Sequence, residues 1–272
     1  MPAPGQHSTV NREAGSDRTG FAVRRHPAGS SAGRWWRILA VLAVVATAVV
    51  AGWWLLTGDL FAVAQVETGG YRFTERSRLE SCLESLLGRN IWTLKGSDVT
   101  VAMADLPWVR EVDMQRHLPN HLYLDLREWR PLVTVDGVGD GTRPRVLVGD
   151  GRVLAFPESL VAPALPVLVG VAVAPDSTGV SCLPPHERDQ VLALLAAVES
   201  TGLEAHVPVD FVVAREQGYA IVLAGDAGTL LVGREHFARR LERYMMARDH
   251  LDQGLEVDLR FRDRVTVRRR GS

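Results

Sequence analysis

The chain has 272 residues, of which 46% are hydrophobic and 23% are charged, as is usual for folded proteins. Its formal net charge is −1, so bulk basicity does not indicate a nucleic-acid-binding protein. The charge is unevenly distributed, because six of the 31 basic residues but only two of the 32 acidic ones lie in the first 37 residues. A basic N-terminal segment therefore precedes a mildly acidic body.

The N-terminal segment, residues 1–37, is rich in Gly, Ser, Pro and Arg and has no apolar period. This composition predicts a disordered tail, because too little apolar surface is available to form a core. The Arg24-Arg25 pair could bind anionic lipid headgroups, or it could serve only as a topology signal.

Residues 38–58, "ILAVLAVVATAVVAGWWLLTG", contain no charged side chain. A helix rises about 1.5 Å per residue, so some 20 residues cross the roughly 30 Å hydrocarbon core of a bilayer. Tryptophan pairs stand at both ends, Trp35-Trp36 and Trp53-Trp54, as suits the two membrane interfaces. We predict a transmembrane helix over residues 38–58, the one part of the chain expected to contact the lipid bilayer.

Two alternatives to a retained span are a buried core helix and a cleaved signal peptide, since Ala62-Val63-Ala64 resembles a cleavage site. The long preceding region and the length of the apolar run favour a retained anchor. Short Arg-rich flanks stay in the cytoplasm. We therefore expect a single-pass protein of the cell inner membrane, with a cytoplasmic N-terminus and residues 59–272 outside the cytoplasm.

The first elements after the span are a strand and two short helices. Phe61–Thr68 alternates apolar and polar residues, which predicts a strand. A helix should follow with Thr74 as its N-cap and Gly88 at its end. A second short helix is expected to be capped by Ser97 or Asp98.

Residues 106–131, "LPWVREVDMQRHLPNHLYLDLREWRP", predict a hairpin of two strands. Apolar residues alternate on both sides of Pro119-Asn120, which mark the turn. Pro131 should end the second strand, because proline has no N–H for the ladder. The element order over residues 59–131 is then β-α-α-β-β.

This order and motif spacing resemble the POTRA domain that follows the membrane anchor in the FtsQ/DivIB family of bacterial cell-division proteins. We interpret the matching residues as structural anchors of that domain, with Trp108 in the core. The anchors are Pro107, Trp108, Val109, Arg116, Pro119, Glu128 and Pro131.

Residues 132–272 read as a second, β-rich domain. Asp150-Gly151 marks a hairpin, and Pro184-Pro185 opens a helix. Three strands, another helix and a last strand with a possible bulge near Arg262-Asp263 follow. The predicted fold class is α+β: one transmembrane helix, a POTRA domain, and a mixed α/β domain with a mainly antiparallel sheet.

The chain offers few catalytic or ligand-binding motifs. His117 and His121 flank a turn without an acidic or Cys neighbour to complete a metal site. The Gly-rich stretch at residues 137–141 is not followed by a helix, so we interpret it as a turn rather than a phosphate loop. We predict no enzyme activity, metal, cofactor, small-molecule substrate or nucleic acid. Whether Cys82 and Cys182 form a disulfide is left open.

The resemblance implies a scaffold of the division septum that links cytoplasmic and periplasmic division proteins. It would recruit FtsB- and FtsL-type bitopic proteins and contact other divisome and septal wall-synthesis proteins. The alternative is a membrane-anchored cell-wall enzyme, or an envelope transport or assembly component, that uses a POTRA module.

The last predicted strand, "EVDLRFRDRVTVRR", is the candidate partner-binding element. An exposed strand edge can accept a partner segment as a further strand. Val257, Leu259 and Phe261 alternate and are expected to pack into the core. By resemblance, the family binds its FtsB-type partner by strand addition near Arg260 and Phe261. The candidate partner-binding residues are Arg260, Phe261, Arg262, Asp263, Arg264, Val265 and Val267.

Overall fold

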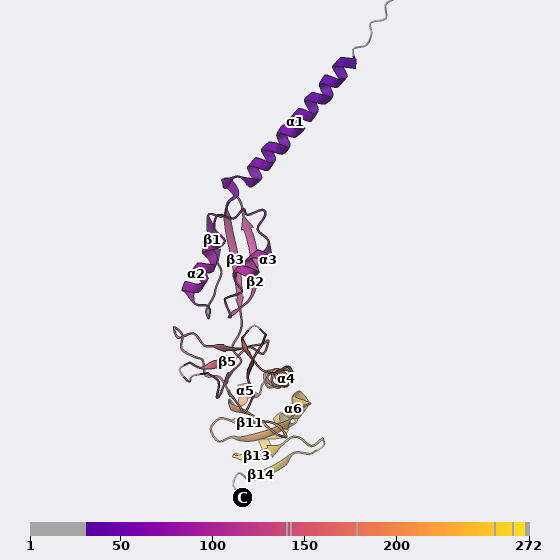
Figure 1. The fold of residues 1–272 in the computed structure, drawn as a ribbon. Coiled ribbons are helices and arrows are strands. Elements are labelled where there is room, and N and C mark those ends of the chain that lie inside the picture. Colours follow the sequence, from indigo (N-terminus) through magenta and orange to yellow (C-terminus); the bar gives the residue numbers. More distant parts are fainter. Residues whose placement is uncertain are drawn as a thin grey trace, which may run out of the picture. The chain divides into compact units, whose positions relative to one another are not determined.

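The computed structural model describes residues 31–139, 141, 143–177, 179–252, 254–262 and 264–269 (Figure 1). Most of the predicted tail, residues 1–30, and Asp263 lie outside the described residues. The helices are α1 (Ser31–Thr57), α2 (Arg76–Glu84), α3 (Gly96–Ala102), α4 (Pro185–Thr201), α5 (Leu203–His206) and α6 (Phe237–Ala247), with two short 3-10 helices, η1 (Asp59–Phe61) and η2 (Arg248–His250).

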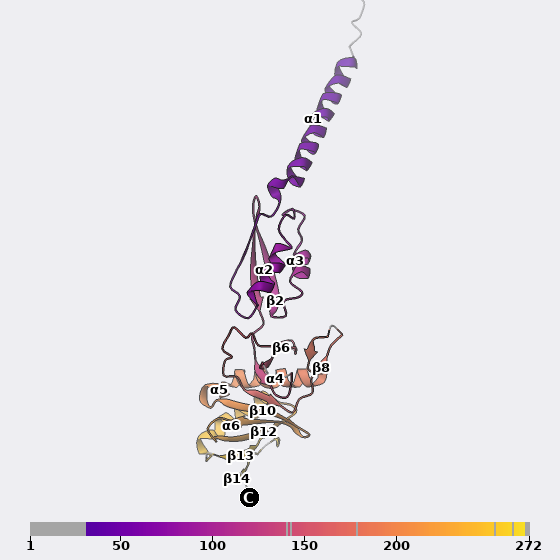
Figure 2. The same cartoon turned by 60° about the vertical axis from the view of Figure 1, so that its left-hand side comes forward.

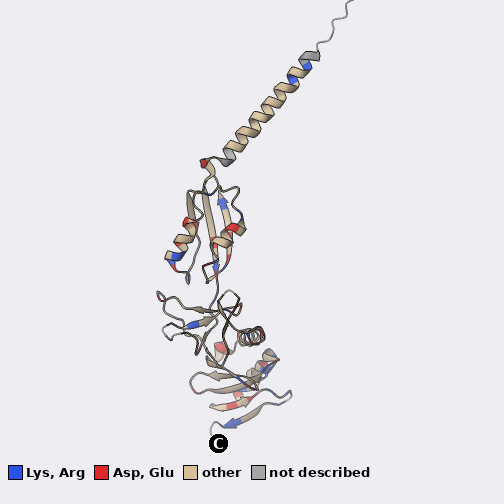
Figure 3. Ribbon diagram, in the orientation of Figure 1, with Lys and Arg blue, Asp and Glu red and all other residues tan. Residues whose placement is uncertain are grey.

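Helix α1 has the length and composition of a membrane span. Its section Arg34–Trp54 is 21 residues long and apolar enough to cross a bilayer, and none of its most apolar stretch is buried. Figure 3 shows this helix in tan along most of its length, with blue only near its start. Residues 31–37, which we predicted as part of the tail, belong to the helix, because no proline interrupts the chain between Ser31 and Ile38.

A three-stranded sheet with two helices follows, which we call the three-stranded domain (residues 59–129). The strand order is β1 (Gln65–Thr68), β3 (His121–Glu128), β2 (Val109–His117). Strand β1 runs parallel to β3, whereas β2 and β3 form the antiparallel hairpin. The predicted β-α-α-β-β order is confirmed (Figures 1 and 2).

The core of this domain is built from the alternating residues of β3 and the apolar faces of the helices. Leu122, Leu124 and Leu126 are at most 3% exposed, as the period of a half-buried strand requires. The Arg116 side chain donates hydrogen bonds to the carbonyl oxygens of Ile91 and Leu94, at 2.9 and 2.6 Å. A charged side chain thus fixes the loop that precedes α3.

The strand predicted over Phe61–Thr68 is shorter in the structure. Its first residue, Phe61, is the last residue of η1, and Ala62 makes an isolated bridge to Asn90. The Val63 N–H donates to the Arg89 carbonyl oxygen at 2.9 Å. Ala62 and Val63 therefore pair with the residues after α2, and pairing with β3 begins only at Gln65.

Both predicted helix caps are wrong. The Thr74 hydroxyl and N–H both donate to the Glu128 carboxylate, so Thr74 belongs to a loop and α2 begins at Arg76. Helix α3 begins at Gly96, and the Asp98 carboxylate accepts from the Lys95 N–H at 3.0 Å. Asp98 is thus the N3 partner of Lys95 rather than the cap residue itself.

The rest of the described chain forms a nine-stranded sheet with its helices, which we call the nine-stranded domain (residues 130–269). The strand order is β14-β13-β12-β11-β10-β7-β4-β5-β6. Pairs β13–β12, β10–β7 and β7–β4 are parallel and the other pairs antiparallel, so the predicted mainly antiparallel sheet is confirmed. The strands are β4 (Val133–Val135), β5 (Arg145–Leu147), β6 (Val153–Ala155), β7 (Val167–Val169), β10 (Val209–Arg215), β11 (Gly218–Leu223), β12 (Gly228–Gly233), β13 (Leu255–Asp258) and β14 (Thr266–Arg269), with a separate pair β8 (Ala174–Pro175) and β9 (Ser181–Cys182).

The core of the nine-stranded domain lies between the sheet and helices α4 and α6. Val191 and Leu194 of α4 and Leu241 of α6 are fully buried in the same cluster as Ile221 and Leu230 of the central strands. Helix α4 starts at the predicted proline, whose missing N–H costs nothing in the first turn.

A separate aromatic cluster joins the two domains. Trp108, at the start of the hairpin, stacks on Phe73 with ring centroids 4.8 Å apart. It also meets Phe156, which follows β6, edge-on at 6.1 Å. Trp108 is 5% exposed, so it is buried as predicted. It lies in this aromatic cluster between the domains, however, and not in the leucine-rich core of its own domain.

Candidate partner-binding edge

The C-terminal segment forms a hairpin rather than one strand. Strand β13 pairs parallel with β12 on one side and antiparallel with β14 on the other. The predicted last strand is therefore interrupted, and β13 is not the edge of the sheet. Strand β13 ends at Asp258, and the next residue, Leu259, is 0% exposed and donates its N–H to the Leu231 carbonyl oxygen at 3.0 Å.

Among the described residues, β14 has a strand on one side only. Its Val267 is 38% exposed, and Arg268 and Arg269 are exposed. Figure 3 shows β14 in blue beside β13, which carries red. At the other end of the sheet, β6 has three residues and is followed closely by the junction aromatics. The β14 edge is therefore the longer and more accessible place for a further strand.

Six of the seven candidate partner-binding residues are described, and all lie in β14 or in the connection before it. Phe261 is 40% exposed, and the Arg264 guanidinium lies 4.5 Å from the centroid of its ring. The expectation that Phe261 packs into the core is wrong, because the chain leaves the sheet after Asp258 and the alternation ends. Val257 and Leu259, at 4% and 0% exposed, are core residues as predicted.

Arg260 is already engaged within the chain. Its guanidinium donates to both carboxylate oxygens of Asp258, at 2.6 and 2.9 Å, and also to the Gln217 side chain. The hydrogen bond from Arg260 is the main cause that lowers the pKa of Asp258. This ion pair therefore stabilises the fold at neutral pH, and its contribution is lost only as the pH falls through that lowered pKa.

Two arginines of α6 hold the connection between β13 and β14. Arg243 donates to the carbonyl oxygens of Leu259, Phe261 and Arg262, at 3.1, 2.7 and 2.5 Å. Arg240 donates to the Val232 carbonyl oxygen at 2.7 Å and to that of Arg260 at 3.3 Å. Sequence reasoning missed both residues, although their spacing of three on an amphipathic helix places them on one face.

Replacing Arg243 by alanine should loosen this connection. Three carbonyl oxygens would lose a charged donor, so we expect a loss of about 1–2 kcal/mol and faster amide hydrogen exchange in residues 259–269. The matched control is Arg239→Ala, because Arg239 is exposed on the same helix and should cost less than about 0.5 kcal/mol. An unchanged rate of amide hydrogen exchange in residues 259–269 of the Arg243→Ala protein would show that Arg243 does not hold the connection between β13 and β14.

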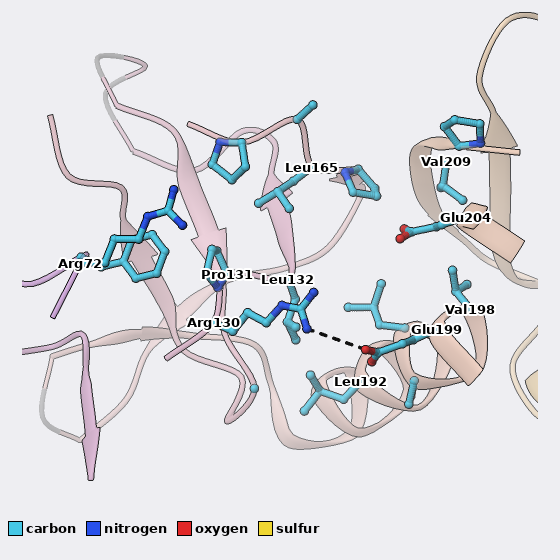
Figure 4. A pocket seen from close by; sticks show the side chains of 18 residues that line it. Arg72, Arg130, Pro131, Leu132, Leu165, Leu192, Val198, Glu199, Glu204 and Val209 are labelled. Atoms are coloured by element: carbon cyan, nitrogen blue, oxygen red, sulfur yellow. Dashed lines mark ion pairs between the residues drawn. The ribbon is translucent and has the colours of Figure 1, made fainter. Parts of the chain in front are cut away.

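The structure also contains a cavity of about 720 Å³ at the meeting of the two domains (Figure 4). Leu132, Leu165 and Leu192 provide apolar walls, and Figure 4 shows Arg130 pointing toward Glu199. The Arg130–Glu199 ion pair measures 3.8 Å, and both side chains are mostly exposed. The cavity is therefore an open, solvated cleft whose facing charges partly neutralise each other.

The residues of interest for metal or redox chemistry are His117, His121, Cys82 and Cys182. His117 and His121 face each other as ladder partners at the end of the β2–β3 hairpin. No group of three or more His, Cys, Asp or Glu side chains that could hold a metal occurs within the part of the chain that is described. Cys82 and Cys182 are free thiols, and burial raises the pKa of each.

The comparisons with known proteins agree with the geometry of the three-stranded domain. The model of the FtsQ-type POTRA domain matches residues 61–129. A cell division protein FtsQ of Myxococcus fulvus is 30% identical over 106 residues, which are 36% of this chain and 37% of the relative. The FtsQ of Burkholderia pseudomallei is 29% identical over 99 residues, 35% of this chain and 39% of the relative. The chain therefore contains an FtsQ-type POTRA domain and is similar over about a third of its length to two FtsQ proteins.

The three-stranded domain is thus an FtsQ-type POTRA domain joined to a candidate transmembrane helix. The chain spans less than two fifths of the length of the curated relatives that it matches. Both relatives are named as cell division proteins.

The POTRA anchors predicted from the motif lie at the two ends of the hairpin. Pro119 stands in its turn, after a cis peptide bond, while Pro107, Trp108 and Val109 stand where β2 begins. Glu128 ends β3 and accepts hydrogen bonds from the N–H groups of Arg72, Phe73 and Thr74, at 2.5 to 3.1 Å. The motif identified the position of Glu128, but only the fold shows that its carboxylate holds the loop before α2.

Proposed function

We propose that this protein is a non-enzymatic scaffold of the cell-division machinery at the septum. The main observation in support of this proposal is an FtsQ-type POTRA domain that begins within a few residues of a helix able to span a membrane. In this proposal residues 1–37 are cytoplasmic, with residues 31–37 forming the start of helix α1. Residues 38–58 are the anchor, 59–131 the POTRA domain and 132–272 the partner-binding β domain, and residues 59–272 lie outside the cytoplasm.

The proposed scaffold recruits FtsB- and FtsL-type bitopic proteins and contacts other divisome and septal wall-synthesis proteins. A fluorescent fusion of the full chain should form rings at midcell. Deletion of residues 61–131 should abolish this targeting, because we assign recruitment to the POTRA domain. A fusion distributed evenly around the envelope would contradict the proposed septal role.

The partner site proposed for the FtsB-type protein is the outer edge of β14. Strand addition there would satisfy main-chain N–H and C=O groups that face solvent in the described structure. The exposed guanidinium groups nearby favour a partner segment with acidic side chains. The neighbouring cations are Arg262, Arg264, Arg268 and Arg269. Phe261 offers an exposed ring at the same end of the hairpin.

Removal of β14 should weaken partner binding at least tenfold, about 1.4 kcal/mol. The test is titration of the partner's outer segment into protein truncated after Val265. This truncation keeps the buried Val257 and Leu259, whereas a cut after Gly254 would also remove core residues. The control is truncation after Arg269, which preserves β14.

Unchanged affinity in the folded protein truncated after Val265 would exclude β14 from the interface. Tighter binding would place the partner on β13 instead, in the position that β14 occupies. Arg260→Glu is a weaker probe of the interface, because it also breaks the ion pair with Asp258.

A further inference from the structure

Three large apolar side chains are exposed at one end of the POTRA domain. Leu60 is 58% exposed, Trp92 48% and Leu118 53%. They come from three separate segments: η1, the loop between α2 and α3, and the turn between β2 and β3. Exposed apolar residues from separate segments that gather at one place are typical of an interaction surface.

Direct contacts bring these segments together. The Ile91 N–H donates to the Phe61 carbonyl oxygen at 2.9 Å, and the rings of Phe61 and Trp92 meet edge-on at 6.0 Å. The Ala64 N–H donates to the Asn120 carbonyl oxygen, also at 2.9 Å. The residues after Leu60 are therefore bonded both to the loop that carries Trp92 and to the turn that carries Leu118.

The length of the connecting chain limits how far this end of the domain can lie from a membrane. Leu60 is the third residue after Thr57, the last residue of α1. An extended chain spans at most about 3.6 Å per residue, so Leu60 lies within roughly 11 Å of the end of the helix. If α1 spans the bilayer, this short connection keeps Leu60, and the segments bonded to its neighbours, within reach of the bilayer surface.

We propose that Leu60, Trp92 and Leu118 form a lipid seat, which inserts into the headgroup region of the membrane that α1 crosses. The proposal rests on the proposed topology of α1. Tryptophan and leucine are favourable at this depth, where an indole can keep its N–H in contact with water. The exposed Lys95 and Asp59 beside the seat can remain among the headgroups. The seat would restrict rotation of the POTRA domain about its short connection to the anchor.

The test is depth measurement on the full chain in lipid nanodiscs. Single cysteines at positions 60 and 118 carry a spin label, in a Cys82→Ser, Cys182→Ser background that is checked for unchanged thermal unfolding. Labels at both positions should lie about 5 Å inside the phosphate level, the depth of interfacial segments. A label at Val161, which is 93% exposed in the nine-stranded domain, is the control and should be in water.

A label at Ala46 in α1 separates the two ways in which the proposal can fail. If the Ala46 label is in hydrocarbon while the label at 118 is as hydrated as that at 161, the seat is wrong and the topology stands. If the Ala46 label is in water, the proposed topology itself is wrong.

A substitution provides the second measurement. Trp92→Glu should move the label at position 118 outward, because a carboxylate is disfavoured in the interface. Val101→Glu is the matched control, since Val101 is 75% exposed on α3 and outside the seat, and should leave the depth unchanged. An equal depth of the label at position 118 with Trp92 and with Trp92→Glu would contradict the proposal that Trp92 and Leu118 belong to one lipid seat.

Discussion

Trp108→Ala should lower the free energy of unfolding by about 3–5 kcal/mol, as expected for loss of a buried Trp. Trp108 is 5% exposed and lies between Phe73 of the POTRA domain and Phe156 of the nine-stranded domain. Its removal leaves a cavity at the junction, so the two domains should also unfold less cooperatively.

The measurement is chemical denaturation of the segment that follows the anchor, residues 59–272. Trp92→Ala is the matched control, because Trp92 is 48% exposed and should cost less than about 1 kcal/mol in solution. A Trp108→Ala protein as stable as the wild type would contradict the buried role of this residue.

The second large effect is expected for Glu128→Ala, at about 3 kcal/mol, because hydrogen bonds to charged groups are strong and their donors would be left unpaired. The Glu128 carboxylate accepts from three consecutive backbone N–H groups and from the Thr74 hydroxyl. The loop before α2 should therefore lose its order along with the stability.

Thermal unfolding and amide exchange of residues 72–74 would measure both consequences. Glu111→Ala is the control, because the Glu111 carboxylate makes an exposed ion pair with Arg127 at 3.4 Å. Such pairs contribute at most about 1 kcal/mol. Protected amides at residues 72–74 in Glu128→Ala would show that another group holds this loop.

The sequence alone was sufficient to predict the elements that are determined by residues close together in the chain. An uncharged run long enough to cross a bilayer predicts the helix α1, and the structure contains it. The alternation at Leu122, Leu124 and Leu126, together with the turn signal at Pro119-Asn120, predicts the β2–β3 hairpin, which the structure also contains. These features depend on the period of neighbouring side chains, which a single segment specifies by itself. The spacing of the anchors around Trp108 also sufficed to suggest the family.

Features that depend on residues distant in the chain required the tertiary structure. Thr74 has the chemistry of a helix cap, but Glu128, 54 residues away, takes its hydroxyl instead. The alternation through Phe261 predicts one continuous strand, but the α6 arginines bind the carbonyl oxygens of residues 259–262 and the chain folds back as β14. A local pattern cannot show which partner will satisfy a polar group, because that partner is brought close only when the chain folds.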